Sequence, residues 1–286
     1  MGVGFKKTPA ENAFHQIQTR DLIDHLSEYK SVILAYSGGV DSTLLLYLLH
    51  KAALQKLIAV TSTSETYDAR DLDIARKHTQ GLGIEHIIVE TCELEDPDFT
   101  ANSYERCYFC KKVLFSKIWE IAGLNSINNI MDASNADDVL DYRPGSKAAR
   151  ELKVISPFKD FSWNKNVIRD VSKEMSISGW DRPATVCLAS RIPYMTPISE
   201  DKLKKVQFGE DYLQGLGFEP VRVRSDGISA RIEVKADDID RIMKSPARED
   251  IIDRFLAIGF KFVSVDLEGF KSGKMNRMVA GWTSKS

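Results

Sequence analysis

Short apolar runs alternate with longer amphipathic segments along the first 180 residues. The runs are rich in aliphatic residues and short enough to be buried strands; they lie at 31–36, 57–61, 85–90, 127–133 and 154–157. Apolar residues at helical spacing, such as Leu44, Leu45, Leu48 and Leu49, predict helices over about the first 25 residues and over 42–54, 67–82, 107–122 and 165–175. Strands that alternate with helices predict an α/β fold with a parallel sheet.

The pattern changes near residue 180. Three prolines within 181–197 indicate a loop or linker. Beyond it we expect a helix at 200–216, a hairpin of 220–224 and 230–234 around Asp226-Gly227, helices at 237–245 and 248–258, and a strand at 262–267. The chain should therefore contain a first domain at 1–180 and a smaller α+β domain at 181–286. The basic tail from Lys271 is expected to be mobile.

Composition narrows the function classes. A chain of 286 residues fits about two domains. Lys and Arg number 39 and Asp and Glu 41, and this net charge of −2 argues against a strongly basic nucleic-acid binder. No apolar run approaches the ~18 residues that span a bilayer, and the N-terminus has no apolar signal region. We expect a cytoplasmic protein with no membrane partner, in which the four cysteines are not disulfide-bonded.

A glycine-containing loop, Ser37-Gly38-Gly39-Val40-Asp41-Ser42-Thr43, joins the first predicted strand to the next helix. Its glycines allow an anion close to the backbone, and the helix start directs free N–H groups toward that anion. A Walker A loop would need a lysine after the glycines, so the loop suits pyrophosphate better than γ-phosphate transfer. Asp41 could hold Mg²⁺ with the phosphates. The alternative is an ordinary Gly-Gly turn with an Asp/Ser helix cap.

The string SGGVDS resembles the signature of the PP-loop ATP pyrophosphatase superfamily, whose members have an adenine nucleotide α-hydrolase-like fold and cleave ATP between the α and β phosphates. The resemblance implies an enzyme that adenylates its substrate with ATP and Mg²⁺. The residues it places at ATP are Ala35, Ser37, Gly38, Gly39, Asp41, Ser42 and Thr61. The segment 132–138, DASNADD, would line the same crevice, at the carboxyl end of a strand.

Two of the four cysteines form a CxxC, Cys107-Tyr108-Phe109-Cys110, at a predicted helix start, where the helix dipole would lower a thiol pKa. The pair is a redox centre, part of a metal site, or incidental. Cys187 is the candidate third member, because Cys92 follows a strand and is interpreted as a core residue. Three cysteines could hold three irons of a [4Fe–4S] cluster, with the fourth iron open to sulfide.

Longer strings narrow the resemblance. They are RCYFCKKVLF, DYRPGSKAA, KNVIR, CLASRIPY and RVRSDGISARIE, in this order after SGGVDS. Together they resemble the LarE family of ATP-dependent sulfur transferases of nickel-pincer cofactor assembly, over residues 29–233. Two positions depart from that pattern: Ala133, where glycine is usual, and Met195, where glycine usually follows SRIPY.

The resemblance implies that a carboxylate of pyridinium-3,5-dicarboxylate mononucleotide becomes an acyl-adenylate and then a thiocarboxylate. Cys187 would be either a sacrificial sulfur donor or, with Cys107 and Cys110, a [4Fe–4S] ligand; the three-cysteine count favours the cluster. The family also suggests a homo-oligomer, a hexamer formed partly through the C-terminal domain.

Four residues of the second half are candidates for the substrate site. Ser190 and Arg191 neighbour Cys187, and Arg191 would stabilise a thiolate or bind an anion. Arg222 and Arg224 alternate on a strand, and they either clamp the substrate phosphate or pair with Glu233 and nearby acids on a solvated face.

Three other features stay open at this point. Lys165 and Arg169 either neutralise pyrophosphate or are surface charges. The alternative enzyme is a tRNA thiolation enzyme with a cluster, against which the net charge argues. A nucleotide-binding module without catalysis is the third alternative.

Overall fold

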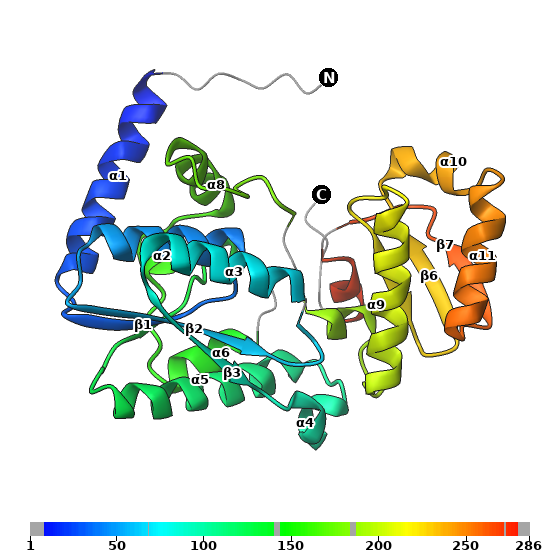
Figure 1. The fold of residues 1–286 in the computed structure, drawn as a ribbon, viewed down its shortest axis with the longest axis horizontal. Coiled ribbons are helices and arrows are strands. Elements are labelled where there is room, and N and C mark those ends of the chain that lie inside the picture. Colours follow the sequence, from blue (N-terminus) through cyan, green and yellow to red (C-terminus); the bar gives the residue numbers. More distant parts are fainter. Residues whose placement is uncertain (1–8, 68, 140–143, 184–186, 272, 280–286) are drawn as a thin grey trace. The chain divides into compact units, whose positions relative to one another are not determined.

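The computed structural model describes residues 9–67, 69–139, 144–183, 187–271 and 273–279 (Figure 1). The sequence features noted at 141–143, 184–186 and 280–286 lie outside the described residues. No helix in the described part of the chain is long and apolar enough to cross a membrane.

The chain divides into two compact units. Unit 1 contains Met1–Thr63, Ala69–Glu90 and Lys111–Thr185, and unit 2 contains Ser64–Asp68, Thr91–Cys110 and Val186–Ser286. Two internal segments, 64–68 and 91–110, therefore belong with the C-terminal part of the chain. These units are defined by contacts within the folded chain. The predicted division at 180/181 is one between domains, and it stays a prediction.

Unit 1 contains a four-stranded sheet in the order β3-β2-β1-β4, with every pairing parallel. The strands are β1 (Ser31–Ala35), β2 (Lys56–Thr63), β3 (Glu85–Glu90) and β4 (Ile130–Met131). This sheet confirms the predicted α/β class. The expected strand at 154–157 is reduced to one bridge between Met131 and Ile155, because Pro157 already begins a helix.

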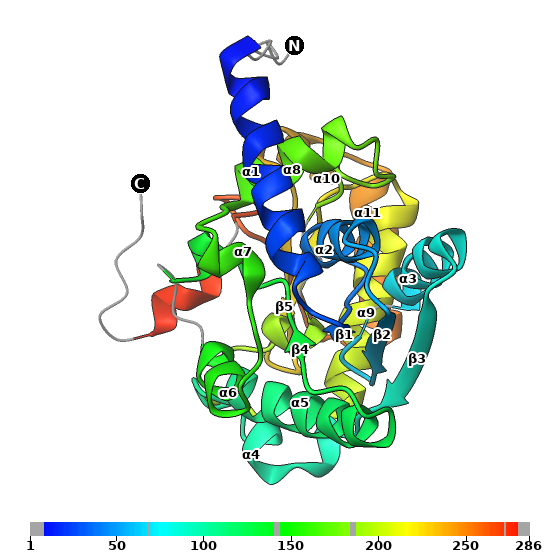
Figure 2. The same ribbon diagram turned by 90° about the vertical axis from the view of Figure 1, so that its left-hand side faces the viewer.

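Helices cover both faces of this sheet. They are α1 (Pro9–Ser27), α2 (Val40–Lys51), α3 (Ala69–Leu82), α5 (Arg106–Leu124), α6 (Gly145–Glu151), α7 (Pro157–Asp160) and α8 (Lys165–Glu174), with the 3₁₀ turn η2 (Ala136–Val139). Two views show α2 and α3 on one face and α5 and α6 on the other (Figures 1 and 2).

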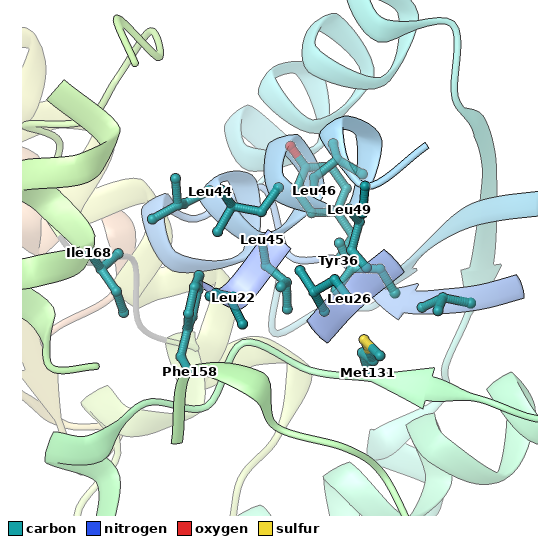
Figure 3. Close-up of a cluster of buried hydrophobic side chains, with 14 of the residues drawn as sticks. Leu22, Leu26, Tyr36, Leu44, Leu45, Leu46, Leu49, Met131, Phe158 and Ile168 are labelled. Carbon is teal, nitrogen blue, oxygen red and sulfur yellow. The ribbon is translucent and has the colours of Figure 1, made fainter. Parts of the chain in front are cut away.

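The core of unit 1 forms around α2, whose leucines are almost completely buried. Leu44, Leu45, Leu46 and Leu49 lie near Leu22 and Leu26 of α1 and near buried residues of β4, α7 and α8 (Figure 3). Burial of each such side chain contributes about 1.5–3 kcal/mol to the stability of the fold. These leucines hold α2 in the core, and the loop before α2 therefore ends at a fixed position.

Unit 2 is a smaller α+β assembly, as predicted. β5 (Arg222–Ser225) pairs antiparallel with β6 (Ser229–Glu233), which pairs parallel with β7 (Phe262–Val265). Its helices are α4 (Pro97–Thr100), α9 (Glu200–Gly215), α10 (Ile239–Ile242) and α11 (Ala247–Ile258), with the 3₁₀ turns η1 (Glu93–Glu95), η3 (Leu188–Arg191), η4 (Ala236–Asp238) and η5 (Lys274–Met278). Phe99 from the internal segment lies in the same core as Phe218, Phe255 and Phe260.

One sequence expectation about this unit is wrong. Cys92 is exposed and is no core residue, because its strand ends at Glu90. In the described part of the C-terminal tail, Lys274 is buried and its Nζ lies 2.7 Å from Asp266 and 3.3 Å from Glu268, and the mobility of the tail stays a prediction.

Candidate functional site

The loop between β1 and α2 has a conformation that needs glycine at one position. Gly38 has φ +73°, and an added Cβ would lie 2.6 Å from the carbonyl oxygen of Asp71. The Ser37 and Ser42 hydroxyls are 3.0 Å apart, the Gly39 N–H donates to Ser37 Oγ, and the Ser42 hydroxyl donates to the Gly39 carbonyl. These bonds hold the loop at the N-terminus of α2, where free backbone N–H groups favour an anion.

Asp41, in the first turn of α2, is fixed by a residue that the sequence did not single out. Asn135 Nδ2 donates to Asp41 Oδ2 at 2.7 Å, and the Asp137 N–H donates to Asn135 Oδ1 at 3.1 Å. Burial raises the pKa of the Asp41 carboxyl, and the Asn135 bond, Lys165 and Arg169 oppose that rise. Lys165 and Arg169 therefore act electrostatically on Asp41, and both alternatives for them stay predictions.

The predicted ATP residues all lie in unit 1, at the carboxyl ends of β1 and β2, in the loop after β1 or in the first turn of α2. Ala35 ends β1 and faces Val60 in the parallel register. Thr61 is buried, and its hydroxyl donates to the Tyr36 carbonyl oxygen at 2.7 Å. This bond leaves the Thr61 side chain in the framework under the loop.

The segment after β4 supplies the other wall of this site. Asp132 is buried and accepts hydrogen bonds from the Ser134 and Ser156 hydroxyls and from Lys111 Nζ. The bonds fix the turn that carries Asn135. The DASNADD string pointed to the segment, but the pattern alone did not identify the one amide that reaches Asp41.

The three candidate sulfur residues, Cys107, Cys110 and Cys187, all belong to unit 2. Cys107 and Cys110 lie in the first turn of α5, and Cys187 immediately precedes η3. Cys107 and Cys187 are exposed, whereas Cys110 is half-buried and its Sγ donates to Glu93 Oε1 at 3.7 Å.

The thiols interact electrostatically, and the pKa values of Cys110 and Cys187 are raised. Burial, Cys187 and Glu93 raise the pKa of the Cys110 thiol well above its ordinary value. The expected lowering by the helix dipole is therefore wrong for Cys110. The dense surroundings of Cys187 raise the pKa of its thiol although one side is exposed, and Arg106 and the Thr66 hydroxyl oppose that rise.

The donor chemistry can be compared with the expected metals. Within the described residues, no three or more His, Cys, Asp or Glu side chains are grouped as a ready metal site. Three cysteines are nevertheless the ligand type of a [4Fe–4S] cluster, and thiols with raised pKa values release their protons when a metal binds. A single carboxylate, Asp41, suits Mg²⁺ that takes its other ligands from phosphates and water. The Mg²⁺ and cluster assignments stay predictions.

The predicted substrate arginines form a buried charge cluster in unit 2. Arg191 is paired with Glu210 through two bonds of 2.8 and 2.9 Å, and Arg224 is paired with Glu233 through bonds of 3.1 and 2.9 Å. Burial and the neighbouring arginines lower the pKa of Arg222 to about 10. The pairing with Glu233 is therefore real, but the expected solvated face is wrong.

This cluster gathers three buried guanidinium groups and two buried carboxylates. Ser190 joins the cluster, because its Oγ accepts from Arg191 at 3.0 Å and its carbonyl oxygen accepts from Arg224 at 2.9 Å. Guanidinium groups match the geometry of carboxylate and phosphate ligands.

Comparison with known proteins agrees with the PP-loop architecture. The family model described as asparagine synthase matches residues 22–110. The chain is 38% identical to an uncharacterised protein of Synechocystis sp., over 91% of this chain and 97% of that relative. It is 32% identical to the pyridinium-3,5-bisthiocarboxylic acid mononucleotide synthase of Lactiplantibacillus plantarum, over 89% of this chain and 92% of that enzyme. The chain belongs to the LarE family. Membership of this family supports the prediction that the chain is an ATP-using synthase or sulfurtransferase.

The two departures from the usual LarE pattern differ in structure. Met195 has φ +66°, the left-handed conformation that glycine adopts most readily, and its side chain is 66% exposed. Ala133 does not have a positive φ, and it packs partly buried against the core of unit 1. Only the Met195 departure therefore places a side chain where the backbone favours glycine.

Proposed function

We propose that this chain adenylates a carboxylate of pyridinium-3,5-dicarboxylate mononucleotide with ATP and converts it to a thiocarboxylate. The observation that carries the proposal is that one chain combines an SGGVDS loop, in which Asp41 is held by Asn135, with three electrostatically interacting thiols. A PP-loop alone would serve many acceptors, whereas a thiol set calls for sulfur as the nucleophile.

The first step forms an acyl-adenylate. A carboxylate oxygen of the substrate attacks the α-phosphorus of ATP, the bond to the β-phosphate bridging oxygen breaks, and pyrophosphate leaves. The loop N–H groups bind the phosphates, and Lys165 and Arg169 offset their charge. Asp41 would hold Mg²⁺, which neutralises the departing pyrophosphate. The carboxylate becomes reactive because AMP is a much better leaving group than oxide.

The second step delivers sulfur to the acyl carbon and releases AMP. In the sacrificial route, Cys187 Sγ attacks, a thioester forms, and loss of the Cα proton with cleavage of the Cβ–S bond leaves dehydroalanine and the thiocarboxylate. In the catalytic route a hydrosulfide attacks directly and Cys187 stays intact. A [4Fe–4S] cluster on Cys107, Cys110 and Cys187 would supply that hydrosulfide from its open iron.

The arginine cluster is the proposed anchor for the substrate. Arg191 and Arg224 are each held by a glutamate, and Arg222 is buried beside them. A phosphate or carboxylate that binds there gains a charge-assisted contact in a buried setting. We also propose that the enzyme is a homo-oligomer, testable by light scattering.

Anaerobic purification followed by iron and sulfide analysis and a product assay tests this proposal. We expect AMP, pyrophosphate and thiocarboxylate in the presence of the pyridinium substrate, and loss of thiocarboxylate in Cys187→Ala. Cys92→Ala is the matched control and should retain full activity, because Cys92 lies outside the three-thiol set. Mass spectrometry of Cys187 after turnover then separates the routes: loss of H₂S from the residue means sacrifice, and an intact residue means sulfide transfer. Full thiocarboxylate formation by Cys187→Ala would contradict the proposal.

A further inference from the structure

A fully buried asparagine lies five residues before the CxxC and is bonded to a distant loop. Asn102 has no exposed surface and φ +55°. Its Nδ2 donates to the carbonyl oxygens of Pro193 and Thr196, both at 2.8 Å, and at 3.4 Å to that of Ile192. Its Oδ1 accepts from Arg106 Nη1. Donor and acceptor are both used, so the orientation of the amide is determined.

Arg106 extends this network to the residue next to Cys107. It is buried, and its Nη1 also donates to the Ala189 carbonyl oxygen at 3.0 Å. Its guanidinium carbon lies 5.2 Å from the ring centroid of Tyr194. Arg106 therefore touches the loop on two sides, through a carbonyl oxygen and through an aromatic face.

Backbone bonds join the same two segments. The Met195 N–H donates to the Asn102 carbonyl oxygen at 3.0 Å, and the Ile198 N–H donates to the Thr100 carbonyl oxygen at 2.8 Å. All of these residues belong to unit 2. The loop that begins at Cys187 is thus attached to the segment that leads into Cys107 and Cys110.

We propose that Asn102 and Arg106 are positioning residues that fix the Cys187 loop in register with Cys107 and Cys110, and so set the separation of the three thiols. Buried amide and guanidinium bonds suit this role, because any shift of the loop would leave buried polar groups without their hydrogen bonds. Such a shift costs free energy, so the loop has one preferred register. The functional use of this register rests on the proposed sulfur transfer, whereas the register itself does not.

Disulfide trapping measures the register directly. The reduced, iron-free full chain is treated with diamide, which takes two electrons and two protons from each thiol pair that it converts to a disulfide. Peptide mass spectrometry then follows the bridge from Cys187 to Cys107 or Cys110, and separately the bridge between Cys107 and Cys110. The second bridge lies within one turn of α5 and is the internal control.

We expect Asn102→Asp to slow the Cys187 bridge about tenfold or more, because a displacement of about 1 Å is enough for such losses. The aspartate keeps the shape but removes both donated hydrogens. The Cys107–Cys110 bridge should keep its rate. Asn129→Asp is the matched control, because it loses a bond to the Ser31 carbonyl oxygen in unit 1 and should leave both rates unchanged.

Arg106→Lys separates positioning from charge and decides the matter if Asn102→Asp does not fold. Lysine keeps the positive charge near Cys187 but lacks the planar guanidinium, whose Nη1 donates to both Asn102 and the Ala189 carbonyl oxygen. We expect a slower Cys187 bridge in this variant. An unchanged rate of the Cys187 bridge in Arg106→Lys would overturn the inference, and so would the absence of a Cys187 bridge in the wild-type chain. Absence of thiocarboxylate formation by the wild type would instead refute only the proposed function, because the bridging rates do not depend on it.

Discussion

At the scale of single residues, two backbone positions with positive φ have opposite relations to their side chains. Gly38 occupies a position where a Cβ would meet the Asp71 carbonyl oxygen, so the sequence matches the backbone. Met195 adopts φ +66° with a long side chain and keeps its N–H bonded to Asn102. The first position limits the nucleotide loop, and the second stores a small strain beside the Cys187 loop.

Substitution at residue 195 should reveal that strain. Met195→Gly is expected to raise the free energy of unfolding by up to about 1 kcal/mol, since relief of ~1–3 kcal/mol of strain is partly offset by added unfolded-state entropy. Met195→Val should lower it, because a β-branched residue tolerates this conformation least. Urea unfolding measures both. Ala133→Gly is the control and should lower stability, since position 133 does not have a positive φ.

Gly38→Ala should abolish ATP binding and lower stability by about 1–3 kcal/mol, because the new methyl group meets a carbonyl oxygen at 2.6 Å and φ is +73°. Calorimetric ATP titration and urea unfolding measure the two effects. Gly81→Ala in α3 is the matched control: its Cβ would meet nothing within 4 Å, so stability should stay equal or rise. Normal ATP affinity in Gly38→Ala would contradict the assigned loop conformation.

At the scale of elements, His86 links β3 to β2 and α3. Thr61 uses its hydroxyl hydrogen on the Tyr36 carbonyl oxygen, so it accepts from His86 Nε2 at 2.8 Å. His86 Nδ1 lies 3.2 Å from the Thr79 hydroxyl. Burial, with Arg76 next in size, lowers the pKa of His86, which favours the neutral imidazole. The framework under the nucleotide loop therefore contains a partly buried histidine whose pKa is lowered.

This arrangement predicts a pH dependence of stability. Because the folded pKa of His86 is below its unfolded value of about 6.5, the unfolded state binds protons first as the pH falls. The contribution of neutral His86 to the free energy of unfolding is complete above pH 6.5. It is lost as the pH drops from there toward the folded pKa. Urea unfolding at pH 7.5 and pH 5.5 should show the loss, and His86→Gln should reduce the difference between the two values. Part of the difference should remain in His86→Gln, because the pKa of His78 is also lowered by burial. An unaltered difference in His86→Gln would contradict the assignment.

The β5–β6 hairpin depends on its buried ion pair. Glu233 is completely buried and binds Arg224 across the hairpin, so Glu233→Gln should lower the free energy of unfolding by about 3–5 kcal/mol. Glu200→Gln removes a carboxylate from an exposed pair with Lys204 and should cost less than ~1 kcal/mol. Equal effects of the two substitutions in urea unfolding would show that burial does not set the strength of the pair.

Local patterns were sufficient for most elements of this fold but not for their grouping. A short apolar run predicted β3 with its observed bounds, and helical spacing placed α2, α8 and α11 to within a few residues. The run at 127–133 yielded only a two-residue strand, because Asp132 turns away to bind two serines. Phe99 joins the core of unit 2 through contacts about 90 or more residues away, which no local pattern contains.

At the scale of the whole molecule, the predicted ATP residues belong to unit 1 and the three thiols to unit 2. The bonds that shape the loop around Asp41 all come from unit 1, and the bonds of the Cys187 loop come from unit 2. Nucleotide binding and sulfur chemistry should therefore be separable by substitution.

A triple Cys107→Ser, Cys110→Ser, Cys187→Ser variant should bind ATP with unchanged affinity. At a hundredfold excess of ATP over its Kd, ligand should stabilise this variant and the wild type equally, by about 2.7 kcal/mol. Thermal unfolding with and without ATP measures the effect. Asp41→Asn is the contrasting variant and should lose most of the stabilisation when Mg²⁺ is present. Loss of the ATP effect in the triple variant would contradict this separation.

The interleaving of the two units has a consequence for how the chain is made. The units comprise six successive segments, so the chain crosses between them five times. On the ribosome, Phe99 emerges long before Phe255 and Phe260, the core residues with which it is later buried. At ~5–20 residues per second, roughly 150 residues of further synthesis leave Phe99 without these core partners for about 8–30 seconds. Nascent chains should therefore bind chaperones through 91–110, and slower translation should prolong this binding.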